Sequence, residues 1–464
     1  MPFQVAILGA GPGGYICAIR CAQFGLKTLL VEERQLGGTC LNRGCIPTKT
    51  LLHSAHLYHD ICRCGKFGIQ VENPAFDYGA VAARRDKIVG QLRGGIDSVL
   101  KSYGVTVAAG RGKLLSSHQI EAGGETFEAR NIVIATGTRP SVPQIEGADG
   151  ANVLSTDDFL ALEKLPESAV IIGGGVTGIE FASILASFGR KVTVLKRSSE
   201  VLPGADEDVT RLLLRKLKQL RVTFKSGITF KRISGESEKT VEYVENATGK
   251  EGTAAGEAVI LCSGRVPNTE SLGLENAGVE TVRGYVPVDD HLRTNIASIY
   301  AIGDVNGRHA LAHAASAQGK AVAAEIASRP YLYHDGAVPS CVYTSPEAAW
   351  VGLSQTQAEA QGYAVRVGRY HIPAAGKGLV MGVDTGLVKV VSDEKSGRLL
   401  GAAIISPRAT DMIAEIAALI SVGATAADLA GTIHPHPTLS EVMWEAADDL
   451  LGLCCHTPKG EAAA

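Results

Sequence analysis

A glycine-rich turn between two short apolar segments occurs twice in this chain of 464 residues. The first copy runs from apolar residues 5–8 through the turn GAGPGG at 9–14 and a helical pattern to a second apolar segment at 27–32. Glycines in such a turn let backbone amides approach a pyrophosphate at the helix N-terminus, and a carboxylate after the second strand, here Glu32, accepts hydrogen bonds from a ribose. The first copy therefore predicts a dinucleotide-binding Rossmann unit, and the alternative is a merely structural turn.

The second copy has apolar residues 169–172, the turn GGGVTG at 173–178, a helical pattern and a second strand at 191–195. Two such units in one chain predict two bound dinucleotides, one electron carrier passing electrons to the other. We refer to residues 9–14 as the first glycine turn and to residues 173–178 as the second glycine turn.

The charge after the second strand differs between the two copies. Glu32 follows Gly9 by 23 positions, whereas the same spacing from Gly173 reaches Lys196, which is followed by Arg197. A carboxylate at this place favours an unphosphorylated ribose, and a cation accommodates a 2′-phosphate. The third glycine of the second turn is typical of NAD sites, so the sequence leaves NAD and NADP both open. The alternative is that both cations are solvated surface charges.

Three later segments complete this pattern. Residues 131–137 and 257–264 each run from a strand into a turn of small residues, and we expect them to close the first and second units. Residues 298–304 form a third such strand with Asp304 at its C-terminal end, where ligands bind in open α/β sheets. Asp304 is therefore expected to contact a cofactor, with a helix cap as the alternative.

The chain changes character from about residue 340. Alternating segments such as 363–367 and 387–391 predict antiparallel strands, and the alanine-rich stretch at 409–422 predicts a helix. The expected fold class is α/β, with two Rossmann-like dinucleotide-binding domains and a C-terminal α+β domain. The tail from about Thr457 is expected to be disordered.

Composition limits the function classes. The net charge of −3 implies no strongly basic face for nucleic acid, and no apolar run reaches membrane-spanning length. The N-terminus shows no basic segment followed by an apolar stretch, so we expect a cytoplasmic protein. In that compartment the ten cysteines are not expected to form structural disulfides, and a disulfide that does form is expected to be catalytic.

Two cysteines separated by four residues, Cys40 and Cys45, lie in the segment GGTCLNRGCIPTK at 37–49, which we call the redox segment. Near the start of a helix they could close a small disulfide loop, and the glycines would let the backbone press against a flat partner. As a bare pattern the spacing also fits buried or metal-binding thiols. The preceding glycine turn and a histidine-proline segment near the C-terminus favour a redox pair.

The histidine-proline segment is TIHPHPTLSE at 432–441. Prolines on both sides of His436 restrict its backbone, and thiol exchange needs a base that holds a proton. Glu441 could orient the imidazole, but Thr438 and Glu441 also match a capping box that opens the final helix. His434 is expected to be structural or solvent-exposed.

Together with AIGDV at 301–305, these motifs occur in the order found in the flavoprotein disulfide reductases, which are FAD-dependent pyridine nucleotide-disulfide oxidoreductases. The chain resembles this family over residues 3–452, most closely its dihydrolipoamide dehydrogenase branch. The resemblance implies a homodimer in which the partner's His436 and the partner's Glu441 complete each active site. It also implies four domains, listed here in chain order: an FAD-binding domain at 1–148, an NAD(P)-binding domain at 149–268, a central domain completing the FAD site at 269–338, and an interface domain at 339–464.

The resemblance also implies roles for single residues. Cys40 would be the thiol that exchanges with substrate, Cys45 the thiolate against the flavin, and Lys49 a flavin contact paired with Glu180. Electrons would pass from dihydrolipoyl groups through the Cys40–Cys45 disulfide and FAD to NAD(P)+, and His436 would take the proton. The implied FAD residues are Gly9, Gly11, Gly14, Glu32, Gly38, Thr39, Lys49, Thr136, Gly137, Gly303 and Asp304, and the implied NAD(P) residues are Gly173, Gly175, Gly178 and Gly264. Glu180 is implied as the carboxylate that pairs with Lys49 on the flavin side. Lys196 is a candidate coenzyme contact that departs from the family pattern, because NAD-specific members usually carry an acid there.

The implied partner is a lipoyl-bearing protein of a 2-oxo-acid dehydrogenase or glycine-cleavage complex, and no metal site is expected. An alternative uses the vicinal pair Cys454–Cys455, which resembles the electron relay of mercuric reductases, to reduce another disulfide or a metal ion. The plain interpretation of that pair is two small apolar residues at a helix end. A non-catalytic binding module is a third possibility. Cys17 and Cys21 are expected to be core thiols.

Overall fold

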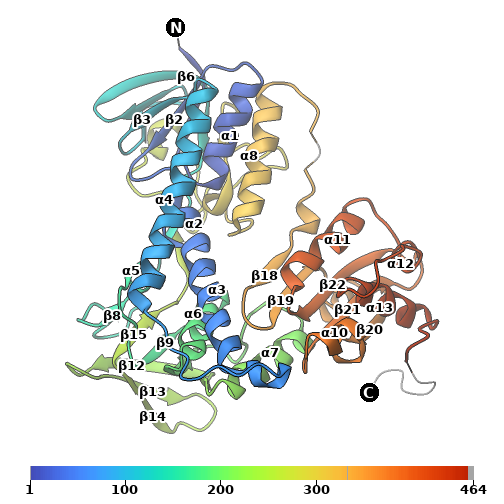
Figure 1. Cartoon of the computed structure of the whole chain (residues 1–464). Helices are drawn as coiled ribbons and strands as arrows, with labels where there is room; N and C mark the ends of the chain where they lie inside the picture. The colour runs from blue at the N-terminus through green and yellow to red at the C-terminus, as the bar shows by residue number, and fades with distance from the viewer. Residues whose placement is uncertain (1, 332, 458–464) are drawn as a thin grey trace.

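The structure, a computed structural model, describes residues 2–331 and 333–457 (Figure 1). The tail that the sequence predicts to be disordered lies outside the described residues, apart from Thr457. No helix in the described part of the chain is both long enough and apolar enough to cross a membrane.

The first glycine turn belongs to a seven-stranded sheet with the order β3-β2-β1-β6-β5-β4, to which β17 adds beside β6. Its strands are β1 (Phe3–Leu8), β2 (Thr28–Glu32), β3 (Thr106–Ala109), β4 (Lys113–Leu114), β5 (Gln119–Ala122), β6 (Glu125–Ile134) and β17 (Ile299–Ala301). The strands β1, β2, β3, β6 and β17 are parallel, whereas β4 and β5 pair antiparallel. The apolar segment at 5–8 is buried, as a parallel strand covered on both faces requires.

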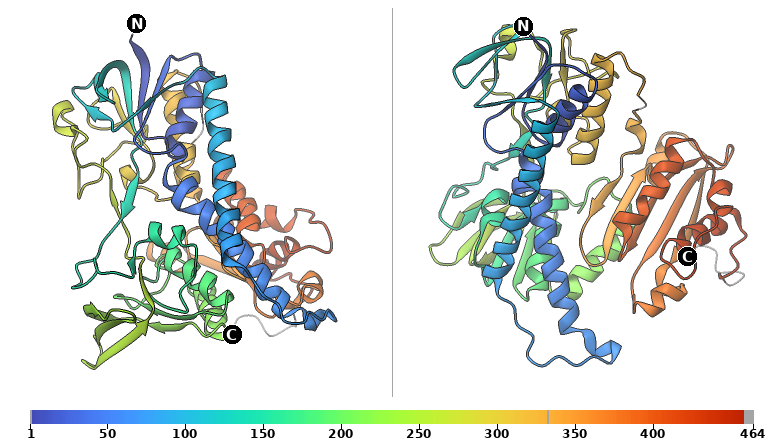
Figure 2. Two further views of the ribbon diagram at one scale, coloured as in Figure 1. Left: turned by 60° about the vertical axis from the view of Figure 1, so that its left-hand side comes forward. Right: turned by 45° about the horizontal axis from the view of Figure 1, so that its top comes forward.

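Strand β17 comes from far along the chain, yet it pairs with β6 in parallel, with Ile299 opposite Ile132. This pairing brings residues 298–304 to the same sheet edge as the first glycine turn. Helix α1 (Pro12–Gln23) begins at that turn and packs against α8 (Ala312–Ile326), beside the long helix α4 (Tyr78–Ser102) (Figures 1 and 2). The helices touch closely, because a Cβ on Gly319 would lie 2.5 Å from the carbonyl oxygen of Gly13.

The second glycine turn belongs to a parallel sheet with the order β11-β10-β9-β15-β8. These strands are β8 (Val153–Leu154), β9 (Ser168–Ile172), β10 (Lys191–Leu195), β11 (Thr223–Lys225) and β15 (Ala258–Leu261), and helix α6 (Val176–Ser187) follows the turn. A three-stranded antiparallel sheet of β12 (Ile228–Ser234), β13 (Lys239–Glu245) and β14 (Glu251–Gly256) is inserted before β15.

The strand register shows that Glu32 and Lys196 occupy equivalent positions in the two units. Leu8 lies opposite Val31 in the first sheet, and Ile172 lies opposite Leu195 in the second. The residue after Val31 in the first unit is Glu32, and the residue after Leu195 in the second unit is Lys196. The two side chains occupy equivalent places, as the spacing in the sequence predicts.

The C-terminal part is an antiparallel sheet with the order β18-β19-β22-β21-β20, which we call the C-terminal sheet. Its strands are β18 (Ser340–Val342), β19 (Glu347–Gly352), β20 (Val365–His371), β21 (Leu387–Asp393) and β22 (Leu399–Ser406). Helices α11 (Ala409–Ser421) and α13 (Glu441–Leu451) pack against it, confirming the α+β expectation. Its Ile405 shares a core with Leu213 of α7 (Glu207–Gln219) from the second unit, so the sheet is covered on both faces.

Candidate active site

The redox segment lies against the first glycine turn. It forms α2 (Gly38–Arg43) and the start of α3 (Cys45–Cys62). Gly38 has a φ of 59°, and a Cβ there would lie 2.5 Å from the Cα of Gly11. The amide of Gly37 donates to the carbonyl oxygen of Ala10 at 2.8 Å. Glycine is required at this contact because no side chain fits between the two backbones.

Cys40 and Cys45 are half-buried free thiols that share a side-chain hydrogen bond. This bond, together with burial, raises the pKa of Cys40. The hydrogen bond from Cys40 lowers the pKa of Cys45, and the charge of Lys49 lowers it further. Cys45 is the first residue of α3, where the helix dipole favours an anion. The pair is thus arranged as one protonated thiol and one stabilised thiolate.

Lys49 is fixed by two neighbours from other parts of the chain. Its Nζ lies 2.9 Å and 3.0 Å from the two carboxylate oxygens of Glu180, which is 3% exposed. The ring of Tyr343 lies 4.6 Å from the same Nζ, and the Tyr343 amide donates to Glu180 at 3.0 Å. The lysine–glutamate pair implied by the sequence resemblance is present, and Tyr343 covers it.

Two tyrosines near the thiols belong to none of the sequence motifs described above. Tyr15 lies in the first turn of α1, and burial followed by the charge of Cys40 raises its pKa. Its position directly after the first glycine turn was a usable signal, because that turn contacts the redox segment. Burial also raises the pKa of Tyr343 to about 12. Nothing local in the sequence connects Tyr343 with Lys49.

The first glycine turn leaves an open cradle at the N-terminus of α1. Gly11 is the N-cap residue without a side-chain cap, and the nearest atom to an added Cβ is a Gly38 carbon 4.0 Å away. Glu32 accepts from the Ala10 amide at 2.8 Å, and Asp304 accepts from the hydroxyl of Thr138 at 2.7 Å. Open space, free helix amides and two carboxylates suit a dinucleotide such as FAD.

The other implied FAD residues lie at the same sheet edge. Thr136 Oγ1 donates to the carbonyl oxygen of Asn268 at 2.8 Å. Gly137 has a φ of 63° and open space beside it. The amide of Gly303 donates to Gln318 Oε1 at 2.7 Å. These contacts fix the turns that follow β6 and β17. Four of the glycines predicted to bind the cofactors are tightly packed against backbone atoms. They are Gly9 and Gly14 in the first unit, and Gly173 and Gly178 in the second.

The second glycine turn offers a similar cradle. Gly175 is the N-cap residue of α6, and no atom lies within 4 Å of a Cβ placed on it. Gly264 is open in the same way, with a φ of 110°. Lys196 donates from Nζ to the carbonyl oxygen of Glu200, and burial lowers its pKa. The space fits a second dinucleotide, and Lys196 stands where a ribose contact is expected.

His436 and Glu441 form a pair at 2.7 Å between Nδ1 and Oε2. The other carboxylate oxygen of Glu441 accepts from the Thr438 amide at 3.4 Å, and Thr438 Oγ1 accepts from the Glu441 amide at 3.2 Å. Glu441 therefore orients the histidine and also makes the reciprocal capping contacts. The regular helix α13 begins only at Glu441, with Ser440 as its N-cap residue, so the capping box begins two residues before that N-cap.

The His436 side chain is 78% exposed. Within this single chain, it makes no hydrogen bond or ion pair with Cys40 or Cys45 among the described residues. His434 is buried, with ring nitrogens 2.9 Å from the Thr432 carbonyl oxygen and 2.9 Å from Glu415 Oε1. His434 is structural, which confirms one of the two roles expected for it.

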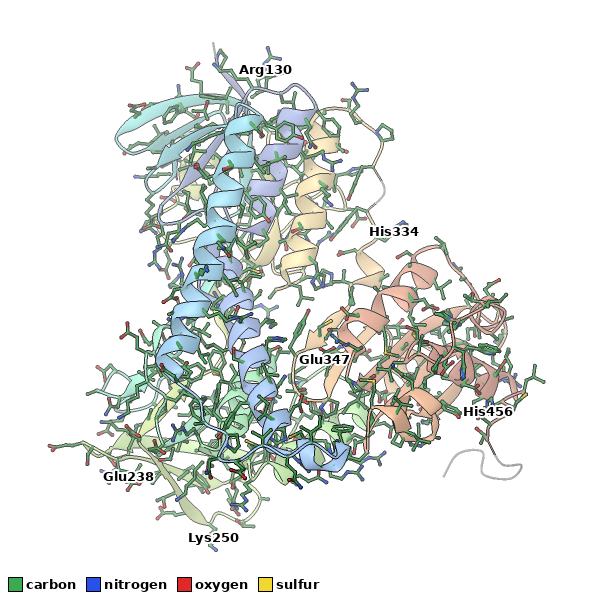
Figure 3. All side chains as sticks on the ribbon, in the orientation of Figure 1. Arg130, Glu238, Lys250, His334, Glu347 and His456 are labelled. Carbon is green, nitrogen blue, oxygen red and sulfur yellow. The ribbon has the colours of Figure 1, made fainter. Side chains whose placement is uncertain are left out.

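The remaining cysteines that the sequence singles out lie elsewhere. Cys454 Sγ lies 3.2 Å from Glu445 Oε2, and His456 Nδ1 lies 2.8 Å from Glu445 Oε1. His456, labelled in Figure 3, marks this cluster on the C-terminal part, away from α2 in Figure 1. Cys17 and Cys21 are fully buried core thiols, as expected. No cluster of three or more potential metal ligands occurs among residues 2–331 and 333–457.

The chain matches known protein families over most of its length. The sequence model of the pyridine nucleotide-disulphide oxidoreductase family matches residues 3–319, and that of the family's dimerisation domain matches residues 338–447. A dihydrolipoyl dehydrogenase of Chlamydia muridarum is 40% identical over 451 residues, covering 96% of both chains. One of Bacillus subtilis is 39% identical over 463 residues, covering 96% of this chain and 97% of the relative.

Two solved structures are similar over almost the whole chain. LpdA from Mycobacterium tuberculosis superposes with a TM-score of 0.89 at 29% identity, covering 96% of this chain and 99% of that one. The HOCl-induced flavoprotein disulfide reductase RclA from Escherichia coli has a TM-score of 0.86 at 29% identity and the same coverage.

Proposed function

The chain belongs to the pyridine nucleotide-disulphide oxidoreductase family, and from this premise we propose that it catalyses the dihydrolipoyl dehydrogenase reaction with FAD and NAD+. The observation that carries the proposal is the Cys40–Cys45 pair, which lies against the first glycine turn and beside the Lys49–Glu180 ion pair. One thiol is kept protonated and the other is stabilised as a thiolate, as disulfide exchange requires.

The open space at the two glycine turns supports one proposed binding place for each cofactor. FAD would lie along the first glycine turn, with Glu32 and Asp304 as its carboxylate contacts and Lys49 beside its ring system. NAD+ would lie along the second glycine turn, with Lys196 near its ribose. When bound, FAD accepts two electrons from the dithiol and passes them on as hydride. Lys49, held by Glu180 and Tyr343, is a fixed positive charge beside the thiolate of Cys45.

The chain's own residues carry out the thiol exchange. A substrate thiolate attacks the sulfur of Cys40 in the Cys40–Cys45 disulfide, which forms a mixed disulfide and releases Cys45 as a thiolate. The second substrate thiol transfers its proton to the partner's His436. Its thiolate then attacks the substrate sulfur that is bound to Cys40. The lipoyl disulfide forms, and both protein sulfurs are left reduced.

The enzyme is a homodimer, since the dimerisation domain of the family matches residues 338–447. We propose that the partner's His436 and the partner's Glu441 complete each site, because His436 is exposed and makes no contact with the thiols of its own chain among the described residues. We also propose the domain boundaries 1–148, 149–268, 269–338 and 339–464.

The natural substrate would be a lipoyl-bearing protein of a 2-oxo-acid dehydrogenase or glycine-cleavage complex. We propose a cytoplasmic location, where thiols stay reduced, since the eight cysteines other than Cys40 and Cys45 form no disulfide among the described residues. A Cys454–Cys455 relay is not favoured, since the two relatives described above are dihydrolipoyl dehydrogenases.

The test is reduction of NAD+ by dihydrolipoamide with the purified, flavin-containing protein. Turnover is expected with wild type and with the Cys454→Ser/Cys455→Ser variant, and its loss is expected with Cys45→Ser. Absence of turnover in a flavin-loaded wild type would contradict the proposal. Loss of turnover in the double serine variant alone would instead support the relay.

A further inference from the structure

A lysine in the middle of the C-terminal sheet is almost completely buried. The side chain of Lys389, on β21, is 5% exposed, although its alternating strand pattern suggests a solvent-facing residue. Its Nζ lies 2.8 Å from Asp206 Oδ2 and 3.0 Å from Asp208 Oδ2. Burial alone would raise the pKa of Asp208, but the hydrogen bond and charge of Lys389 lower it. A buried ammonium group requires such partners.

Asp206 is the residue that Lys389 fixes most directly. It is 4% exposed and is the N-cap of α7, with Oδ1 accepting from the amides of Asp208 at 2.9 Å and Val209 at 3.4 Å. One oxygen therefore holds the helix start and the other faces Lys389. Lys389 thus fixes the place where α7 begins, at the junction of the second unit and the C-terminal sheet (Figure 1).

The segment that leads into Asp206 borders the second nucleotide cradle. This segment, residues 196–205, is called the coenzyme loop below, and it starts at Lys196, the structural equivalent of Glu32. In its middle the Leu202 amide donates to the carbonyl oxygen of Gly174, in the second glycine turn, at 2.9 Å. Leu202 has a φ of 53°, which is unfavourable for leucine, so surrounding contacts must hold it.

We propose that Lys389 is a positioning residue for the coenzyme site, acting through Asp206 on the coenzyme loop. This inference rests on the proposed function insofar as it takes NAD+ as the ligand of the second glycine turn. The loop is attached to the turn at Leu202 and to the C-terminal sheet at Asp206. Asp208 is partly exposed and also pairs with Arg211 at 2.7 Å and Arg369 at 3.5 Å, so it keeps a cation without Lys389. Asp206, at 4% exposed, would instead be a buried carboxylate without its ammonium partner, and the loop end would move to hydrate it.

A second lysine provides a matched control. Lys216, which is itself on α7, forms an ion pair with Asp384 at 2.6 Å, and therefore joins this helix to the C-terminal part of the chain. Lys216 lies near the C-terminal end of α7, whereas Asp206 lies at its N-terminal end. If general attachment of α7 were what matters, both lysines would affect coenzyme binding alike.

The experiment compares Lys389→Met with Lys216→Met in the flavin-containing enzyme by calorimetric titration with NAD+. We expect Lys389→Met to bind NAD+ about tenfold more weakly, the size of effect typical of coupled buried groups, and Lys216→Met to match wild type. The KM for NAD+ should rise in Lys389→Met, with the KM for dihydrolipoamide unchanged. Equal weakening in both variants, or unchanged binding in Lys389→Met, would overturn the proposal.

A second variant guards against misfolding of Lys389→Met. Asp206→Asn keeps an oxygen that can cap α7 but loses the charge that faces Lys389, so it should also weaken NAD+ binding. Normal NAD+ binding in a folded Asp206→Asn enzyme would overturn the proposal. The titration contains no dihydrolipoamide, so failure of the proposed substrate would not alter its result.

Discussion

The two thiols of the redox segment differ because their surroundings differ. Cys45 receives the hydrogen bond from Cys40, starts a helix and faces Lys49, whereas Cys40 keeps its proton. Glu180 opposes the effect of Lys49 on Cys45, since its negative charge raises the thiol pKa. The hydrogen bond from Cys40 has the largest effect on the pKa of Cys45, and these two charges adjust that pKa further, in opposite directions.

Opposite charge changes should therefore move the Cys45 titration in opposite directions. Removing the cation in Lys49→Met should raise the pKa of Cys45, and removing the anion in Glu180→Gln should lower it. The measurement is the thiolate ultraviolet absorbance of the dithiol enzyme against pH, with the same titration of Cys45→Ser subtracted. Midpoints that stay at the wild-type value in both variants would show that neither charge acts on Cys45.

Glu441 has two roles that substitutions can separate. Glu441→Gln keeps an oxygen for the Thr438 amide, so its unfolding free energy should stay near wild type, whereas Glu441→Ala should lose about 1 kcal/mol with the cap. Both variants lose the carboxylate that faces His436, so turnover should fall about ten- to a hundredfold in each. Thermal unfolding and steady-state kinetics check the two parts. Full activity in Glu441→Gln would show that Glu441 only caps the helix and that its charge does not assist His436.

At the scale of elements, the close approach of α1 and α8 fixes the first glycine turn. A methyl group on Gly319 would press on the backbone of Gly13, so Gly319→Ala should destabilise the protein by about 1–3 kcal/mol and weaken flavin retention. Gly90→Ala is the control, because Gly90 also lies inside a helix but has open space around it. It should be neutral or stabilising. Equal unfolding midpoints for the two variants would contradict this packing argument.

The first residue of the coenzyme loop, Lys196, is expected to affect the KM for NADP+. Lys196 occupies the position equivalent to Glu32, where a ribose contact is expected. In Lys196→Glu the new carboxylate would repel a 2′-phosphate, so the KM for NADP+ should rise about tenfold or more. The KM for NAD+, which has no 2′-phosphate, should change little. Lys191→Glu is the control, because Lys191 lies at the exposed start of β10, the strand that ends just before Lys196, and it should change neither KM. Steady-state kinetics with both coenzymes would check this. An unchanged KM for NADP+ would make Lys196 a plain surface charge.

The elements that the sequence predicts well are those with local signals. Apolar runs and glycines marked both nucleotide units, and spacing alone placed Lys196 at the position in the second unit that Glu32 occupies in the first. Contacts between distant segments had no such signal. Lys389 belongs to an alternating strand pattern, and only the packing of α7 onto the second face of that strand explains its burial. Tyr343 reaches Lys49 for the same kind of reason, since tertiary packing brings them together.

At the scale of the whole molecule, the chain contains every group that the proposed reaction needs but does not bring them together. The thiols lie on α2 and α3, whereas His436 contacts Glu441, the first residue of α13. Helices α2 and α13 lie far apart in Figure 1. The match of residues 338–447 to a dimerisation domain supplies the second chain. In a closed twofold dimer, a residue given to the partner's site is received back from the partner at its own site.

Mixed dimers test this exchange directly. Cys45→Ser and His436→Ala homodimers should each lose at least about a hundredfold in turnover, because each lacks an exchange thiol or a base. In a mixed dimer of the two variants, one site combines both defects, and the other combines an intact thiol pair with an intact histidine. Differently tagged chains, co-expressed and purified through both tags, should therefore recover about half the wild-type turnover per dimer. Mixed dimers as inactive as their parents would show that each chain uses its own histidine, since every site would then contain one defect.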